Sequence, residues 1–125
     1  MIIVSTDTPE FISPSTATVL QNRLGAQKAG TFDINSALCR LCYSPYNSSK
    51  FYPADVQYRK VLVVGAYAMS KYLNHQDKKT VTLFADGAGA FVLEASGRSR
   101  QGFLGGEMRA MGQYNEWMGI YAGGS

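Results

Sequence analysis

Residues 60–67 have the sequence KVLVVGAY, which is apolar at nearly every position and predicts a β-strand buried on both of its faces. Strands of this kind are typical of parallel sheets that carry helices on either side. Two shorter strand-like runs come before it, MIIVST at 1–6 and TFDI at 31–34. A helix is predicted between these two runs, over residues 15–24. The order of strand, helix, strand, helix, strand predicts an α/β fold with a layered sheet.

The helix predicted over residues 15–24 has a signal at each end. Ser15 is a residue type that accepts hydrogen bonds from the first backbone N–H groups of a helix. Gly25 suits the position where a helix stops, because glycine adopts a left-handed backbone without steric cost. Apolar side chains recur between them at helical spacing, at Ala17, Leu20 and Leu24.

The segment after the long strand differs in kind. Residues 80–96, TVTLFADGAGAFVLEAS, are predicted to form two successive strands joined through 86–89, where glycines suit a bend or a close backbone approach. One more strand is expected within 101–111. Asp86 lies among the glycines. We expect its carboxylate to accept hydrogen bonds from backbone N–H groups rather than to act in catalysis.

The composition is that of one small domain. The 125 residues are 46% hydrophobic, which is enough for a single core, so 1–125 is expected to be one domain. The net charge is only +3 and the basic residues are scattered, which argues against nucleic acid as a partner. No apolar run approaches the roughly 18 residues that span a bilayer, and the start lacks the features of a signal peptide. We therefore expect no membrane association and a cytoplasmic location.

Cys39 and Cys42 form a C-x-x-C motif in the stretch where the sequence changes character most abruptly. A zinc site would need a second pair of ligands. The only histidine, His75, is far away in sequence and is expected to be a solvated loop residue. Metal binding is therefore disfavoured. Cys39 is a candidate catalytic nucleophile, and the alternative is that both cysteines are ordinary small buried side chains.

Four motifs, in order along the chain, resemble β-ketoacyl-acyl carrier protein synthase III. They are TPEFISPSTATVLQNRLGA at 8–26, GTFDIN at 30–35, VQYRKVLVVGA at 56–66 and TLFADGAGAFVLEAS at 82–96. Each motif alone would be weak, but their order and separations make the resemblance specific. It runs nearly from end to end of the chain, apart from about 38–50, and it covers well under half of a family member.

The resemblance implies a thiolase-like fold, in which two similar α/β halves are stacked in layers. This chain would be an incomplete part of it, a mixed sheet with covering helices. Family members transfer an acyl group from acyl-CoA to a cysteine and condense it with malonyl-carrier protein in fatty acid biosynthesis. The implied partners are acyl-CoA, acyl carrier protein and a second subunit of a homodimer. No cofactor is implied, because the coenzyme A thioester is a substrate.

The resemblance also implies a Cys-His-Asn site, whose histidine and asparagine come from the second half of the fold. His75 does not match the family's histidine by position, so the chain alone is expected to be inactive. Two ways of counting from the family motifs place the nucleophile at different positions. Counting forward from Phe32 places it at position 38, where this chain has Leu38, whereas counting backward from Gly65 places it at Cys39.

The residues that follow the cysteine depart from the family pattern, which has an apolar helix there. Pro45 would break a helix begun at position 38. One hypothesis is a compensated frameshift over residues 38–49, since codons shifted by one base can be chosen to encode Cys-Ala-Gly-Phe from position 38.

Two other functions stay open. The chain could be a non-enzymatic, truncated or pseudo-enzyme fragment that acts as an interaction module. It could also derive from a related polyketide-type condensing enzyme, which shares the fold and the thiol chemistry.

Overall fold

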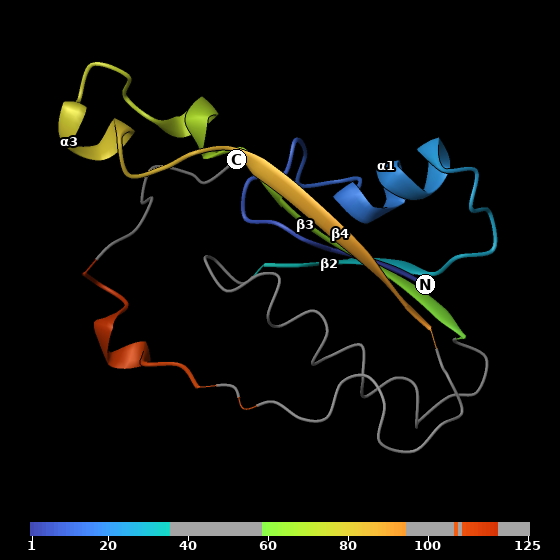
Figure 1. The fold of residues 1–125 in the computed structure, drawn as a ribbon. Coiled ribbons are helices and arrows are strands. Elements are labelled where there is room, and N and C mark those ends of the chain that lie inside the picture. Colours follow the sequence, from blue (N-terminus) through green and yellow to red (C-terminus); the bar gives the residue numbers. More distant parts are fainter. Residues whose placement is uncertain (36–58, 95–106, 108, 118–125) are drawn as a thin grey trace.

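The computed structural model describes residues 1–35, 59–94, 107 and 109–117. Four strands, two α-helices and two short 3-10 helices are found there (Figure 1). In chain order they are β1 (Ile2–Ser5), α1 (Thr16–Arg23), β2 (Thr31–Ile34), β3 (Lys60–Tyr67), η2 (Met69–Tyr72), α3 (Lys78–Val81), β4 (Gly87–Glu94) and η3 (Gly112–Tyr114).

The four strands form one mixed sheet in the order β2-β1-β3-β4. β1 pairs in parallel with both β2 and β3, whereas β4 runs antiparallel to β3. The first part of the chain thus has the predicted strand, helix, strand order, with β1 in the middle of three parallel strands. The expectation of a mixed α/β sheet is confirmed.

The core lies on both faces of β1, because successive side chains of a strand point to opposite faces. Ile2 and Val4 pack with Ala17 of α1 on one face. Ile3 packs with Val61 and Val63 of β3 on the other face. The side chains that extend this second cluster are Met1, Phe32, Ile34, Phe91 and Leu93. β1 is therefore buried on both sides, as parallel strands usually are.

Both predicted end signals of α1 are confirmed. The Ser15 hydroxyl accepts a hydrogen bond from the backbone N–H of Thr18 at 3.3 Å. Gly25 has φ +64°, the left-handed backbone conformation that glycine adopts most easily. The helix therefore begins and ends close to where the sequence predicts.

The prediction of two strands within 80–96 is wrong. Residues 78–81 form the short helix α3, and among the described residues of this range, 80–94, β4 (Gly87–Glu94) is the only strand. Asp77 explains the difference, because its side chain accepts hydrogen bonds from the Lys79 N–H and the Thr80 hydroxyl and so caps a helical turn. β4 pairs instead with β3 over all eight of its residues.

The strand expected within 101–111 falls mostly outside the described residues. The described residues of that range, 107 and 109–111, do not form a strand. Across the described part of the chain, no helix is both long enough and apolar enough to cross a membrane.

Candidate active site at the carboxyl edge of the sheet

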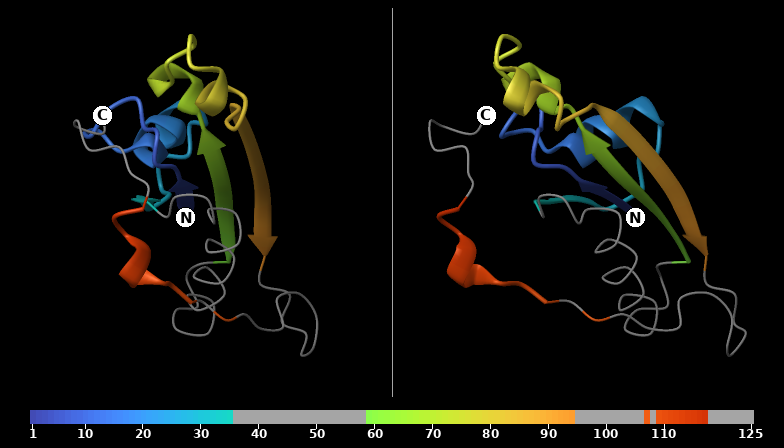
Figure 2. Two further views of the ribbon diagram at one scale, coloured as in Figure 1. Left: turned by 90° about the vertical axis from the view of Figure 1, so that its left-hand side faces the viewer. Right: turned by 60° about the vertical axis from the view of Figure 1, so that its left-hand side comes forward.

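The carboxyl ends of β1, β2 and β3 meet at one edge of the sheet, because these strands are parallel. β4 runs the other way, so its first residue, Gly87, lies at the same edge opposite Tyr67. Figure 2 shows β3 pointing toward η2 and α3 at this edge and β4 returning from it. In parallel α/β sheets this is the edge where functional residues gather.

A buried network of threonines joins the strand ends at this edge. The Thr6 N–H donates to the Ile34 carbonyl at 3.1 Å, which links the end of β1 to the end of β2. The Thr8 hydroxyl accepts a hydrogen bond from the Ala68 N–H at 2.9 Å, which links the loop after β1 to the end of β3. The Thr8 N–H in turn donates to the Thr6 hydroxyl at 3.1 Å. Both threonines are only 5% exposed, so the bond between them is buried, whereas the bond to Ala68 is half-buried.

Asp33 ties β2 to the start of α1. Its two carboxylate oxygens accept hydrogen bonds from the backbone N–H groups of Thr16 and Ala17, at 2.6 and 2.7 Å. These N–H groups have no partner within the helix, and the positive end of the helix dipole favours a carboxylate there. Sequence reasoning missed this role. The available signal was an acidic residue between two apolar ones, Phe32 and Ile34, in a short strand.

Asp86, the residue before β4, is hydrogen-bonded to Ser70 of η2. Its carboxylate accepts hydrogen bonds from the Ser70 N–H, at 2.8 Å, and from the Ser70 hydroxyl. The hydroxyl bond and then the backbone bond lower the pKa of Asp86 from its ordinary value. The predicted role as an acceptor of backbone N–H groups is confirmed, although the partner is 16 residues away rather than in a local turn.

The predicted nucleophile, Cys39, lies outside the described residues, as does Cys42. The structure does describe the strand that precedes Cys39 in sequence. This strand, β2, ends at Ile34, and Asn35 is the last described residue before position 59. His75 is exposed in the turn between η2 and α3, which confirms the prediction of a solvated loop residue. The structure therefore does not bring His75 into the candidate site.

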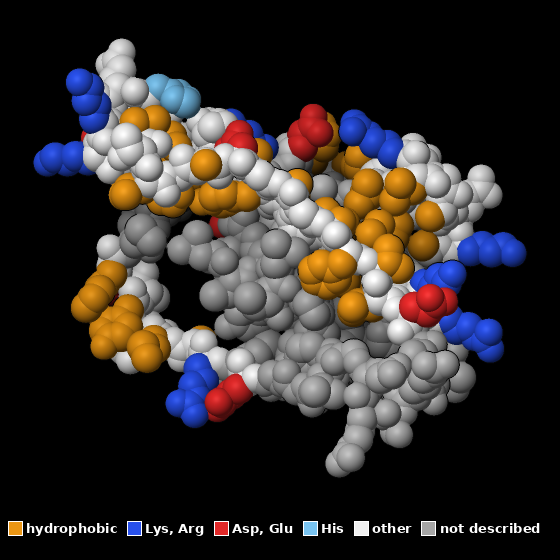
Figure 3. Space-filling model, in the orientation of Figure 1, with side chains coloured by type: hydrophobic (Ala, Val, Ile, Leu, Met, Phe, Trp, Pro, Cys, Tyr) orange, Lys and Arg blue, Asp and Glu red, His pale blue; other side chains and the backbone are white. Residues whose placement is uncertain are grey.

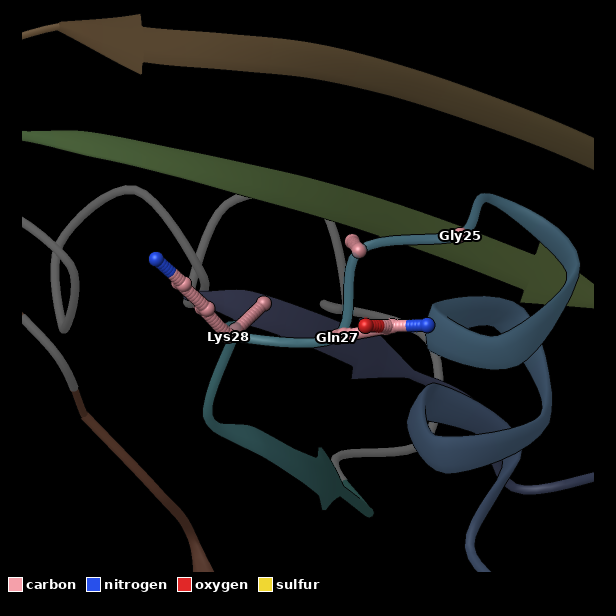
Figure 4. A pocket seen from close by; sticks show the side chains of 5 residues that line it. Gly25, Gln27 and Lys28 are labelled. Carbon is pink, nitrogen blue, oxygen red and sulfur yellow. The ribbon is translucent and has the colours of Figure 1, made fainter.

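A surface hollow of about 420 Å³ lies at the opposite edge of the sheet, lined by residues 25–29 between α1 and β2. Figure 4 shows the Gln27 side chain extending toward α1 and the Lys28 side chain extending the other way. Among the described residues, those that line this hollow are distinct from Thr6, Thr8, Asp33 and Asp86. It is separate from the carboxyl edge.

Comparison with known proteins bears directly on this edge. Residues 32–112 match the family model of 3-oxoacyl-[acyl-carrier-protein (ACP)] synthase III. The match begins in β2 and extends beyond β4. It therefore includes most of β2 and all of β3 and β4, whose ends meet at this edge.

Solved structures of this family superpose on the chain. The crystal structure of 3-oxoacyl-[acyl-carrier-protein] synthase III from Aquifex aeolicus VF5 is 36% identical, with a TM-score of 0.68, over 76% of this chain and 30% of that one. The synthase III from Thermus thermophilus is 36% identical, with a TM-score of 0.70, over 75% and 29% of the two chains. A priming β-ketosynthase from the R1128 polyketide pathway is 32% identical, with a TM-score of 0.71, over 76% and 28%.

The chain thus matches about 30% of the length of these relatives. The superpositions confirm the thiolase-like fold and its incompleteness in this chain. Because the family model covers more than half of the residues, the chain belongs to the 3-oxoacyl-[acyl-carrier-protein] synthase III family.

Proposed function

We propose that this chain is part of a condensing enzyme of fatty acid biosynthesis in which Cys39 is the acyl acceptor. The observation that carries the proposal is the family match that begins in β2, the strand that leads to Cys39. The bonds of Asp33 and of the threonine network support it, because they fix the end of this strand relative to α1, β1 and β3.

The proposed first step is acyl transfer. The Cys39 thiolate attacks the carbonyl carbon of acyl-CoA, a new thioester bond forms, and coenzyme A leaves as a thiolate. In the second step, malonyl-carrier protein loses carbon dioxide, and the resulting carbanion attacks the acyl-cysteine and expels the Cys39 thiolate. The product is longer by two carbons. The proposed partners are acyl-CoA, acyl carrier protein and a second subunit of a homodimer, and the proposed location is the cytoplasm.

The second step needs groups that stabilise the carbanion. In the family these are a histidine and an asparagine from the second half of the fold. The chain matches about 30% of the length of its relatives, and His75, which is exposed in a turn, does not match the family's histidine by position. We therefore propose that the chain alone accepts an acyl group and does not complete the condensation.

Release of coenzyme A tests this proposal. The full chain is mixed with acetyl-CoA, and released coenzyme A is separated from acetyl-CoA and from the protein by reversed-phase chromatography and quantified by its absorbance. The expected result is a burst of at most one coenzyme A per chain, with no elongated product after malonyl-carrier protein is added. The absence of a burst would contradict the acyl-acceptor role, and steady condensation would contradict the claim that the chain is incomplete.

Two alternatives are distinguished by the same assay. A non-enzymatic interaction module would release no coenzyme A from any acyl-CoA. A polyketide-type condensing enzyme is favoured by the superposition on the R1128 priming β-ketosynthase. It would show a larger burst with starter units other than acetyl-CoA.

A further inference from the structure

Residues 68–86 connect β3 to β4 by a long excursion whose two ends lie side by side. Tyr67, just before the excursion, pairs with Gly87, just after it. The excursion contains η2 and α3, which extend beyond the carboxyl edge of the sheet in Figures 1 and 2. Long connections of this kind are often lids or binding loops.

Little of this excursion is buried. Met69 is only 7% exposed, but none of residues 70–86 is buried. In Figure 3 the histidine and lysine side chains of this region project from the surface of the molecule. A segment with few buried contacts separates from the body of a protein at a low cost in free energy.

Hydrogen bonds inside the excursion join its parts to one another. Ser70 and Asp86 are bonded across its base. Farther out, the Asp77 carboxylate accepts a hydrogen bond from the Thr80 hydroxyl at 2.9 Å, and the Leu83 N–H donates to the Thr80 carbonyl at 3.0 Å. The excursion is therefore built as one body rather than as a loose chain.

The attachment of the excursion to the rest of the molecule is much weaker. Among the described residues, one hydrogen bond joins residues 69–86 to the loop after β1, in which the Lys71 ammonium group donates to the Pro9 carbonyl at 3.2 Å. This bond is exposed to solvent, so water competes for both of its partners. Lys71 also lies over the ring of Tyr72, at 5.3 Å from its centre, but this contact is within the excursion.

Each end of the excursion has a residue at which the backbone can rotate. Ala68 has φ −136° and ψ 54°, which is neither helical nor extended, and its N–H is held by the Thr8 hydroxyl. Gly87 has no side chain, and no atom lies within 4 Å of the position that a Cβ would take. Hinges are a few residues at the ends of elements that absorb changes in backbone angles.

We propose that residues 70–86 form a lid at the carboxyl edge of the sheet, which swings as one body about Ala68 and Gly87. The bond between Lys71 and Pro9 fixes the closed position. In the open position η2 and α3 move away from the loop after β1, which widens access to the edge where β1, β2 and β3 end. The proposal does not depend on acyl transfer, because no residue of the lid is proposed to take part in that reaction.

Distances between pairs of spin labels, measured by double electron–electron resonance, test this motion. The full chain, with Cys39 and Cys42 replaced by serine, carries one label at Leu83→Cys in the lid and the other at Arg23→Cys in α1. A second labelled chain carries both labels within the lid, at His75→Cys and Leu83→Cys. All three labelled positions are exposed, so the fold is expected to tolerate the labels.

The pair between α1 and the lid should give two populations of distances, whereas the pair within the lid should give one. Lys71→Met should raise the ratio of open to closed lid about two- to fivefold, because it removes an exposed hydrogen bond. Lys79→Met is the matched control. It removes the same charge from an exposed position in α3 and leaves the bond to Pro9 in place.

Three results would overturn the proposal. A single narrow distance between α1 and the lid in every variant would show that the lid does not open. Two populations within the lid would show that it does not move as one body. An equal effect of Lys71→Met and Lys79→Met would show that the bond to Pro9 does not fix the closed position.

Discussion

Asp86 and Ser70 are joined by two hydrogen bonds, one from the Ser70 N–H at 2.8 Å and one from the Ser70 hydroxyl to the other carboxylate oxygen. The two residues are 16 positions apart: Ser70 is in η2, just after β3, and Asp86 is the residue before β4. Their contact closes the connection between the two antiparallel strands at the carboxyl edge. It also makes this connection sensitive to the charge of Asp86.

Acid should weaken the fold partly through Asp86. Its pKa is lowered in the folded chain, so its stabilising effect is present above the ordinary value of 3.8 and is lost as the pH falls through the lower, folded value. The variant Asp86→Asn should therefore be less stable at neutral pH and should lose less stability between neutral pH and pH 3. Thermal unfolding at a series of pH values measures this. Glu94→Gln is the control, and an equal change in pH dependence for both variants would contradict the role of Asp86.

Asp33 should stabilise α1 from outside the helix. Asp33→Ala removes the acceptor for the Thr16 and Ala17 N–H groups and should cost about 1–2 kcal/mol of unfolding free energy. Urea unfolding measures the loss. Ser15→Ala removes the local cap of the same helix, so the double variant should lose more than either single variant. A cost for Asp33→Ala below that of an exposed control, Glu10→Ala, would show that the contact contributes little.

Thr8 should stabilise the fold through the hydrogen bond of its hydroxyl group rather than through the packing of its side chain. Thr8→Val keeps the shape but leaves the half-buried Ala68 N–H without its acceptor, and the loss of such a hydrogen bond should cost about 1 kcal/mol. Thr8→Ser keeps the hydroxyl and should lose less. If denaturant unfolding ranks the serine variant below the valine variant, packing rather than the hydrogen bond explains the position.

The coding DNA tests the hypothesis about residues 38–49. If a compensated frameshift is present, translation of this interval in the neighbouring frame gives an apolar Cys-Ala-Gly-Phe segment, with the cysteine at position 38. An alternative frame that contains a stop codon or polar residues would exclude the hypothesis, and Cys39 would remain the candidate nucleophile.

The sequence predicts best what depends on local pattern. The apolar run at 60–67 and the capping residues Ser15 and Gly25 define β3 and α1, because burial and backbone preference are properties of the residues themselves. The error at 80–96 has the opposite origin. Thr80 and Val81 favour strands, yet the cap supplied by Asp77 and the pairing of β4 with β3 decide the outcome.

The contacts that position the candidate site could not be predicted, because they join residues that are distant in the chain. Asp33 reaches back 16 and 17 positions to α1, and Thr8 meets Ala68 across 60 positions. Their acidic and hydroxyl side chains are visible in the sequence, but their partners depend on the order of strands in the sheet. The nucleophile itself, Cys39, lies outside the described residues and stays a prediction.

Peptide mapping after reaction with acetyl-CoA tests the central claim most directly. The full chain, Cys39→Ser and Cys42→Ser are each incubated with acetyl-CoA, digested at low pH to preserve thioesters, and examined by mass spectrometry. The account predicts an acetyl group on Cys39 in the unmodified chain and in Cys42→Ser, and none in Cys39→Ser. An acetyl group that persists in Cys39→Ser, or no acetylation of Cys39 in the unmodified chain, would contradict it.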